Sequence, residues 1–521
     1  MRHQYDVAVV GSGFGGAITA MITQRLGLRT VLLERGRHPR VVIGESSTPL
    51  ADLLIEELAT RYDLPVLHQL SKWGSWQRNH PELACGLKRG FSFFHHQSGS
   101  DARIERDRQL LVAASPNDAI GDTHWYRADL DAFLVEEAQR LGVTYADCAD
   151  LREFAEHSYG AILRGTREGT ELHIEAKFVV DATGQRGFLH RALGLGEVAL
   201  PEFPPTQSLY SHFRGVRRLD QTGAVALDPS PPYPIDDAAV HHLFDGGWVW
   251  VLRFNNGIAS AGISATKALA KDLGLAEGAR AWGRVLDRFP VFRQQFAQSE
   301  AVQPFRYMPS LSFRSTAITG ARWALLPSAA GFADPLLSTG FALNLLGITR
   351  LAEIFEHDWR GADFASRLAS YAEKTDAEFL AASRLIVALY ANLSNFRVFS
   401  ALTLLYFAAA SYAETARRLG KAYLAQSYLL YDHPQFGPAC EAIVQQARTI
   451  HGEAEADEII EAVLRAISPI DVAGLTRRDR NNWYPVETYD LLQAVEKVHA
   501  SRGEVLQMLE QCGFSSAPLP V

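Results

Sequence analysis

A glycine-rich segment near the start of the chain has the residue types and spacing to bind a dinucleotide. Gly11, Gly13 and Gly16 follow an apolar run at residues 6–10 and precede residues that favour a helix. Glycines there let the backbone approach a pyrophosphate at the positive end of a helix. Glu34 ends the next apolar run, where a carboxylate accepts hydrogen bonds from ribose hydroxyls and repels a 2′-phosphate. The pattern predicts a Rossmann βαβ unit that binds a nucleotide, rather than a tight turn alone.

Two later segments predict strands that extend the same sheet. Residues 177–184 run from an apolar stretch into a turn, and residues 322–330 do the same before Gly331. Both resemble the segments that complete the cofactor site in FAD-dependent hydroxylase-type folds, although Pro327-Ser328-Ala329 replaces the usual Gly-Asp-Ala. The resemblance implies FAD as the cofactor. It also implies cofactor contacts from the first turn and from these segments, namely Phe14, Gly15, Asp181, Gly184, Ser328, Asp334 and Gly340.

Five separated segments carry a narrower resemblance, in the same order along the chain. They are residues 43–49, 86–93, 124–131, 241–251 and 334–340. Together they resemble the flavin-dependent halogenases over about residues 5–420, and most closely the phenylpyrrole-chlorinating branch. The resemblance implies that reduced FAD and oxygen form a hydroperoxide, that chloride or bromide attacks it, and that hypohalous acid passes through a tunnel to a lysine.

Lys88 matches that lysine. An ammonium group is a compact cation with three donors, so it can orient hypohalous acid, polarise its halogen or form a haloamine. Taken alone, Lys88 beside Arg89 would be interpreted as a solvated surface residue, because lysine is usually exposed. The matching surroundings favour the catalytic interpretation instead.

Trp248 and Trp250 match the two indoles that keep the substrate away from the flavin in this family. By spacing alone they are two large side chains on one face of a strand, which is usually a core face. Leu252 and Arg253 replace the family's Ile-Pro pair. This departure leaves open a monooxygenase that hydroxylates an aromatic or peptidyl aromatic substrate through a C4a-hydroperoxide.

Ser338, Thr339 and Gly340 match the halide-binding segment, where backbone N–H groups form a small anion site. The alternative is an ordinary glycine-containing turn before a helix. Tryptophan halogenases have a glutamate just before this segment, and this chain has Leu337. The resemblance therefore implies a ring more activated than tryptophan, such as a phenol, pyrrole or resorcinol.

Glu45 and Arg127 match family positions close to the isoalloxazine and the dinucleotide. Each could equally be a structural ion-pair partner. Two histidine pairs, His95-His96 and His241-His242, lack further metal-ligating residues at helical spacing. We interpret them as pocket or surface histidines, with a substrate base as the alternative, and predict no metal site.

The remaining pattern predicts an α/β fold, with an FAD-binding Rossmann-like domain of the hydroxylase/halogenase type. Residues 207–214 and 248–254 alternate like strands of an antiparallel substrate sheet. The C-terminal region is predicted to be helical, with the apolar residues 398–413 in a buried helix rather than a membrane-surface or partner-docking one. Further helices are expected at residues 365–391, 412–428, 440–450 and 489–498.

We expect a halogenase-like core over residues 1–375 and a helical region over residues 376–521. The core is discontinuous. Its FAD part covers about residues 1–60, 120–200 and 315–375, and its substrate sheet covers about residues 61–119 and 201–314.

Composition restricts the class of protein. The 521 residues include 51 Lys and Arg against 59 Asp and Glu, which gives a net charge of −8 and argues against nucleic-acid binding as the function. Four separated cysteines without a CxxC pair predict free thiols in a reducing compartment. The N-terminus lacks the apolar segment of a signal peptide. We therefore expect a cytoplasmic protein that does not insert into a membrane.

The sequence as a whole predicts a two-component FAD-dependent halogenase of secondary metabolism. No second GxGxxG unit is available for a nicotinamide nucleotide, so a separate flavin reductase is expected to supply reduced FAD. The substrate is expected to be a small aromatic molecule, either free or bound to a carrier protein or peptide. Besides the monooxygenase, a flavin-binding protein without turnover remains an alternative.

Overall fold

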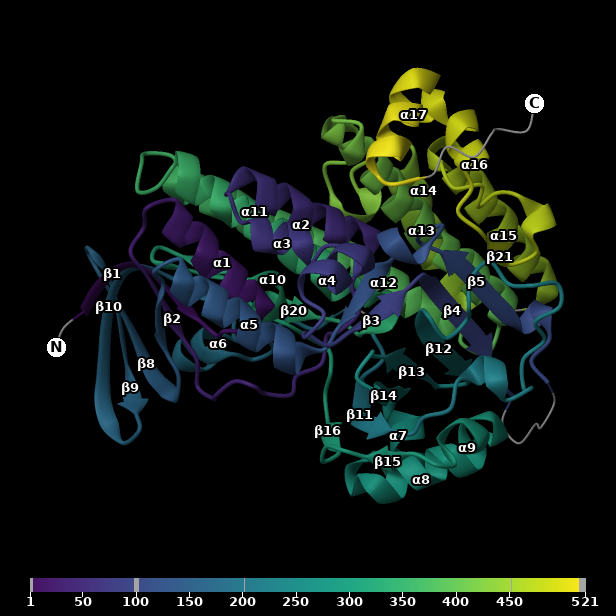
Figure 1. Ribbon diagram of the computed structural model, residues 1–521, viewed down its shortest axis with the longest axis horizontal. Helices are drawn as coiled ribbons and strands as arrows, with labels where there is room; N and C mark the ends of the chain where they lie inside the picture. Colours follow the sequence, from purple (N-terminus) through teal and green to yellow (C-terminus); the bar gives the residue numbers. More distant parts are fainter. Residues whose placement is uncertain (1–2, 98–102, 201, 451, 515–521) are drawn as a thin grey trace.

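The computed structural model describes residues 3–97, 103–200, 202–450 and 452–514, and its first sheet begins with the predicted βαβ unit. Strands β1 (His3–Val10) and β2 (Thr30–Leu33) pair in parallel, and helix α1 (Phe14–Arg25) connects them. All of β2 and the apolar residues 7–10 of β1 are buried, because a parallel sheet is covered on both faces. The unit lies in the left half of Figure 1, near the N-terminus.

The two later strands join β1 as predicted. β10 (Thr170–Asp181) pairs in parallel with β1, and β19 (Trp323–Leu325) pairs in parallel with β10. The second of these strands is shorter than predicted, because Pro327 cannot donate to a ladder and instead begins helix α10 (Pro327–Ala330). The other strands of this sheet are β7 (Thr144–Ala146), β8 (Ala149–His157), β9 (Gly160–Arg167) and β18 (Thr319–Gly320).

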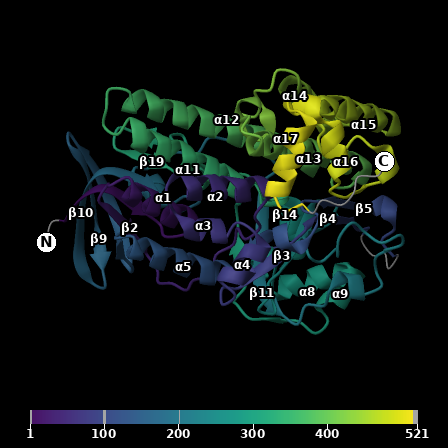
Figure 2. The same ribbon diagram turned by 45° about the horizontal axis from the view of Figure 1, so that its top comes forward.

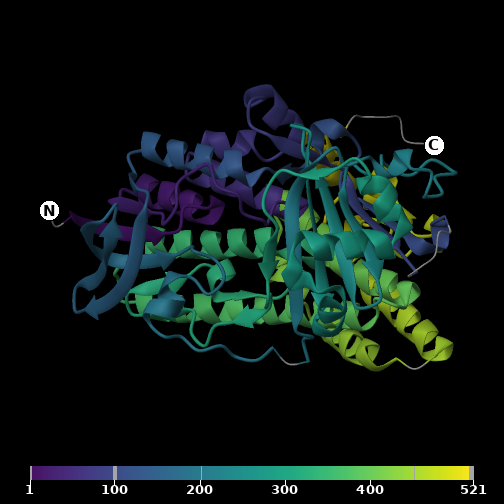
Figure 3. The same cartoon turned by 90° about the horizontal axis from the view of Figure 1, so that it is seen from below.

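The second sheet is mostly antiparallel, as predicted. Its centre is formed by β11 (Thr206–Arg214), β14 (Ile258–Thr266), β13 (Gly247–Arg253) and β12 (Ala239–Phe244) in that order. Figure 3 shows these strands from below, beside the long helices of the molecule. The outer strands are β4 (Gly90–His95), β5 (Gln109–Ala113), β15 (Glu300–Ala301), β16 (Arg306–Met308) and β21 (Trp483–Tyr484).

Two short antiparallel ladders lie outside these two sheets. β3 (Cys85–Lys88) pairs antiparallel with β6 (Asp122–Trp125), and β17 (Phe313–Arg314) pairs with β20 (Gly331–Phe332). The β3–β6 ladder carries Lys88 at its end, so two hydrogen-bonded strands fix the base of that side chain.

Helices cover both sheets. Beside the first sheet lie α2 (Pro49–Arg61), α5 (Arg127–Arg140) and α11 (Thr339–His357), and α1 packs on α5 and α11 (Figures 1 and 2). The shorter helices around them are α3 (Pro65–Gln69), α4 (Trp73–Asn79) and α6 (Phe188–Ala192). Below the second sheet in Figure 1 lie α7 (Lys267–Leu273), α8 (Ala279–Arg288) and α9 (Pro290–Phe296).

The C-terminal region is helical, although three helices differ from their predicted bounds. The helix expected at residues 440–450 begins four residues earlier and ends at residue 446, followed by a 3₁₀ turn. The helix expected at residues 412–428 is wrong: α13 (Phe396–Arg418) ends before Gly420, whose φ of +71° closes the helix. The helix expected at 489–498 is α16 (Thr488–Gln493) followed by a 3₁₀ turn. The others are α12 (Phe364–Ala391), α14 (Phe436–Gln446), α15 (Glu453–Ile467) and α17 (Arg502–Gln511).

Helix α13 is a core helix, as its apolar sequence predicts. Among the described residues it is long and apolar enough to cross a membrane, but 83% of its apolar window is buried inside the protein. One hydrophobic core joins this helix to the first sheet, and a second lies between the second sheet and α7–α9. The division of the chain at residue 375 stays a prediction. All four cysteines are free thiols.

Candidate active site

The glycine turn opens into a cavity of about 600 Å³, the first cavity of the site. Gly11 has a φ of +98°, and a Cβ there would lie 2.6 Å from the Ala182 carbonyl oxygen. A Cβ at Gly16 would lie 1.8 Å from the Gly11 oxygen. Gly16 does not line the cavity, so its part is to let α1 approach the turn. Gly11, Gly13, Phe14 and Gly15 do line it.

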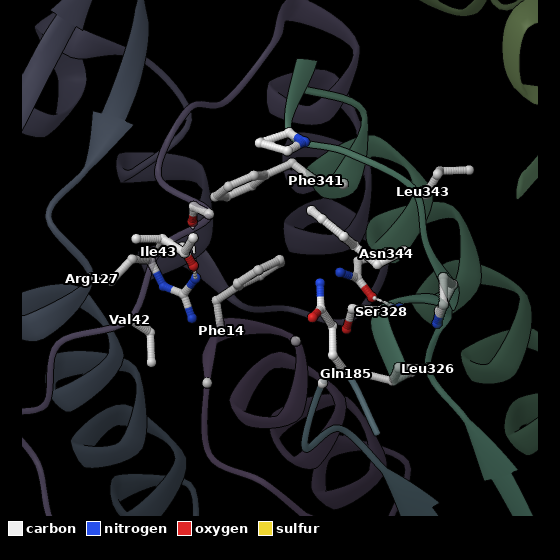
Figure 4. Close-up of a pocket in the computed structure, with 18 of the residues that line it drawn as sticks. Phe14, Val42, Ile43, Arg127, Gln185, Leu326, Ser328, Phe341, Leu343 and Asn344 are labelled. Atoms are coloured by element: carbon white, nitrogen blue, oxygen red, sulfur yellow. Dashed lines mark hydrogen bonds between the residues drawn. The ribbon is translucent and has the colours of Figure 1, made fainter. Parts of the chain in front are cut away.

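The groups around this turn fit a bound FAD. Gly13 caps α1 without a side-chain hydrogen bond, which leaves the amides of the first turn for a pyrophosphate. Figure 4 shows Arg127 beside Phe14 on one side of the cavity, where the guanidinium carries the charge that a pyrophosphate needs. Apolar side chains on both sides offer surfaces to the flavin and adenine rings, among them Val42, Ile43, Leu326 and Phe341.

Glu34 and Arg127 are held in place by neighbours. Glu34 accepts from Ser12 N at 3.0 Å and Gly36 N at 2.8 Å. Although burial opposes its ionisation, Arg40 and these donors hold the pKa of Glu34 below its ordinary value. Arg127 donates two 2.8 Å bonds to Asp131, so the ion-pair interpretation and the cofactor interpretation both fit it.

The later segments contribute unequally to the first cavity. Gly184, Ser328 and Asp334 line it. Asp181 does not line it, and its predicted cofactor contact stays a prediction. Its buried carboxylate accepts from Thr183 N at 2.8 Å and Leu189 N at 2.6 Å, so it shapes the turn.

The predicted halide segment has an unusual backbone. Leu337 and Ser338 have φ angles of 67° and 55°, a left-handed conformation that costs about 1 kcal/mol or more per residue. Ser338 makes no side-chain cap, so the amides of Thr339 and Gly340 at the start of α11 stay available. All three residues of the segment line the first cavity. A helix N-terminus of this kind suits an anion, although halide binding here stays a prediction.

The two indoles of β13 form one wall of the first cavity. Trp248 and Trp250 are 1% and 6% exposed, with ring centroids 5.7 Å apart. Trp248 Nε1 lies 3.1 Å from both Asp334 Oδ1 and the Tyr390 hydroxyl. The Tyr390 hydroxyl donates to Asp334 Oδ2 at 2.8 Å. Burial raises the pKa of Asp334 to about 6, although these donors oppose the shift. Asp334 therefore anchors the wall.

The departure from the family's Ile-Pro pair leaves this wall intact. Leu252 lines the first cavity, whereas Arg253 donates to Asp236 Oδ1 at 3.1 Å and to the Val216 carbonyl at 2.9 Å. The added positive charge is thus neutralised away from the indoles.

Glu45 also lines the first cavity, and the sequence did not reveal its partner. Glu45 Oε1 lies 2.7 Å from His212 Nε2, and both side chains are buried. His212 shares a face of β11 with Ser208 and Tyr210, which line the cavity. The alternation of residues along β11 was the signal in the sequence that could have placed His212 at the cavity. Of the predicted histidines, His241 lines the first cavity, and all four are buried rather than at the surface.

Lys88 lies between the first cavity and a second one. Its side chain is 0% exposed, its Nζ donates to the Ser47 carbonyl, and Nζ lies 3.8 Å from the Phe91 ring centroid. Ser46 lines the first cavity, while Thr48 and Phe91 line the second. Lys88 itself lines neither cavity, so its ammonium is enclosed by protein between residues that line the first cavity and residues that line the second.

The second cavity has a volume of about 420 Å³ and was not foreseen from the sequence. Its wall combines α2, α4, β4, β5 and α13 with the C-terminal helix α17. Aromatic and apolar side chains dominate it, including Phe91, Tyr406, Phe407, Met508 and Phe514. Charged side chains also line it, among them Glu56, Lys72, Arg78, Glu414 and Arg418. A largely apolar surface with polar groups at some points is typical of a site for a small organic molecule.

Known proteins are similar to this chain in sequence and in fold. No protein-family profile matches the chain. Tetracycline 7-halogenase from Kitasatospora aureofaciens is 28% identical over 385 residues, which cover 72% of this chain and 68% of the relative. The monodechloroaminopyrrolnitrin halogenase PrnC of Pseudomonas fluorescens is 28% identical over 406 residues, 77% of this chain and 70% of PrnC. The crystal structure of halogenase PltM with phloroglucinol and FAD has a TM-score of 0.79 at 23% identity, covering 92% of this chain and 99% of PltM.

The fold, the first cavity and these similarities define an FAD-dependent oxidoreductase. Within that class, the chain is related to the flavin-dependent halogenases, which confirms the resemblance seen in its motifs. The relatives also include a 1H-pyrrole-2-carbonyl peptidyl-carrier-protein chlorinase, 26% identical over 346 residues. Relatives of this chain thus have substrates of more than one kind.

Proposed function

We propose that this protein halogenates an electron-rich aromatic ring, such as a phenol or pyrrole, with chloride or bromide. The observation that carries the proposal is the position of Lys88, fully buried between a cavity that fits FAD and a separate apolar cavity. Reduced FAD, when bound, would give two electrons to oxygen, and the halide would give two more as it becomes hypohalous acid, with the second oxygen atom released as water.

Residues of the chain itself would carry out the remaining steps. The amides of Thr339 and Gly340 would bind halide at the first cavity, and Trp248 and Trp250 would keep the aromatic substrate out of it. Lys88 Nζ would hold the oxygen of hypohalous acid and give its proton to the departing hydroxide. The proton that the ring carbon loses then restores the ammonium. Overall, the ring exchanges one hydrogen for one halogen, and hypohalous acid is converted to water.

The test is an assay with the purified protein, FAD, a separate flavin reductase, NADH, oxygen, bromide and phloroglucinol. We expect bromophloroglucinol by mass spectrometry, and none without bromide. A hydroxylated ring would indicate a monooxygenase. Reduced flavin consumed with no modified ring, across a panel of phenols and pyrroles, would favour a flavin-binding protein without turnover.

The partners and the compartment belong to this proposal. The single predicted nucleotide-binding unit supports a separate reductase, and the free thiols fit a reducing cytoplasm. The ring would bind in the second cavity, which supports a small molecule or the small ring of a carrier-bound or peptide-bound substrate. Secondary metabolism agrees with the antibiotic-type compounds in the names of the relatives.

The second cavity predicts which side chain limits substrate size. Met508 on α17 is buried and lines this cavity, so Met508→Trp should fill part of it. We expect kcat/KM for a naphthol-sized ring to fall about tenfold, with less than about a threefold change for phloroglucinol. Met508→Leu, which keeps the volume, is the matched control. Equal losses for both rings in steady-state kinetics would mean that the ring binds elsewhere.

A further inference from the structure

Two buried carboxyl groups beside Lys88 have no part in the steps above. Asp52 lies near the start of α2 and Asp122 begins β6, and their side chains are 0% and 1% exposed. Asp122 is the residue opposite Lys88 in the β3–β6 ladder. Buried carboxylates are stable only when a charge or a hydrogen bond compensates them, so their position beside an ammonium group requires an explanation.

Ser47 connects Asp52 directly to Lys88. Its backbone carbonyl accepts from Lys88 Nζ, and its hydroxyl donates to Asp52 Oδ1. The second oxygen of each carboxyl, Asp52 Oδ2 and Asp122 Oδ2, has no hydrogen bond. Lys72 Nζ lies 3.8 Å from Asp52 Oδ2. Lys88, Asp52 and Asp122 are thus buried together, and the partly exposed Lys72 lies at their edge. Burial raises the pKa of both carboxyl groups, most strongly that of Asp52 next to Asp122, and Lys72 opposes the rise in both.

The other titratable groups around Lys88 do not carry the compensating charge. Burial lowers the pKa of His124 on β6 and of His241 on β12 to about 3, so both are neutral near pH 7. From α13, Glu414 and Tyr406 act on Asp122. Glu414 is itself paired with Arg418 at 2.8 Å. The negative charge nearest to Lys88 therefore comes from Asp52 and Asp122.

We propose that Asp52 and Asp122 are positioning residues that keep Lys88 an ammonium ion and hold it at the boundary of the two cavities. The inference rests on the proposed function only for what Lys88 does there. The pair acts by charge and through Ser47, and it forms no bond to the substrate.

The expected effect of removing one carboxylate follows from the charges. Burial lowers the pKa of Lys88 to about 8, and Asp122 and Asp52 oppose that shift. An opposite charge at close range shifts a pKa by about one to three units. Asp122→Asn should therefore move the titration of Lys88 down by about one pH unit or more, so that about half or more of the amine is neutral near pH 7.

The experiment titrates the amine in the protein without cofactor or substrate. Potassium cyanate carbamylates only the unprotonated amine, and peptide mass spectrometry gives the rate at Lys88 relative to exposed Lys271 from about pH 5 to 10. We expect a midpoint near pH 8 in the wild type and midpoints about one unit lower in Asp122→Asn and Asp52→Asn. The high-pH limb of kcat/KM for phloroglucinol bromination should move by the same amount.

Asp236→Asn is the matched control, because Asp236 is another buried carboxyl group that pairs with Arg253 at 3.1 Å. It should lower the melting temperature without moving the midpoint of Lys88. Folded Asp52→Asn and Asp122→Asn proteins whose midpoints and pH profiles stay at the wild-type values would overturn the inference. A shifted midpoint in a protein that halogenates nothing would instead support the inference and refute the proposed function.

Discussion

Replacing Lys88 with methionine should lower kcat/KM for phloroglucinol bromination by about a thousandfold, while FAD binds within about twofold of the wild-type affinity. Lys88 is enclosed at the boundary of the two cavities, whereas the FAD-binding turn is built from other elements. Removing its ammonium takes away the donor that would hold hypohalous acid and protonate the departing hydroxide. Mass spectrometry of the product and fluorescence titration of FAD give the two quantities.

The fold should tolerate this change. Methionine has nearly the length of lysine and suits the contact with the Phe91 ring. Without the ammonium, Asp52 and Asp122 can take up protons, because burial already raises the pKa of both carboxyl groups. Lys271→Met, at an exposed position on α7, is the control for loss of one positive charge. Bromination that survives Lys88→Met to within about tenfold would remove this residue from the mechanism.

Local patterns in the sequence predicted the nucleotide-binding part of the fold because its requirements are local. The turn from Gly11 to Gly16 and the acidic residue Glu34 lie within one βαβ unit, and their backbone needs are visible in the residue types. The same is true of the alternating residues in β11 and β13. These elements form as predicted.

Other parts of the site depend on contacts between distant segments and were not predictable. The Tyr390 hydroxyl and Trp248 are 142 residues apart in sequence, and His212 and Glu45 are 167 apart. No residue pattern encodes such pairs, since their geometry follows from how α12 and the second sheet pack. The second cavity likewise exists only because α17 packs near α2 and α13.

For Lys88, the amino-acid type alone predicts the wrong environment. Its amino-acid type alone favours a surface position, and only the resemblance of its surroundings pointed to a catalytic one. Its burial depends on Ser47 and on two carboxyl groups from other elements. A buried lysine is thus recognised from its tertiary partners rather than from its neighbours in sequence.

Gly16→Ala should abolish measurable FAD binding, which corresponds to a loss of at least about a hundredfold in affinity. A Cβ at Gly16 would lie 1.8 Å from the Gly11 oxygen and 3.0 Å from its carbonyl carbon, and both are backbone atoms that no rotamer change can move away. The first turn of α1 must therefore shift away from the strand. Its free amides would then no longer face the first cavity, where a pyrophosphate would bind.

Gly283→Ala provides the matched control, because it adds the same methyl group in helix α8, where no atom lies within 4 Å of the new Cβ. It should bind FAD like the wild type and unfold at an equal or slightly higher temperature, since alanine favours a helix. Fluorescence titration and thermal denaturation of both variants separate a local effect on the turn from a general loss of stability. If Gly16→Ala bound FAD with wild-type affinity, the cofactor would have to bind without close contact with this turn, and the first cavity would need another occupant.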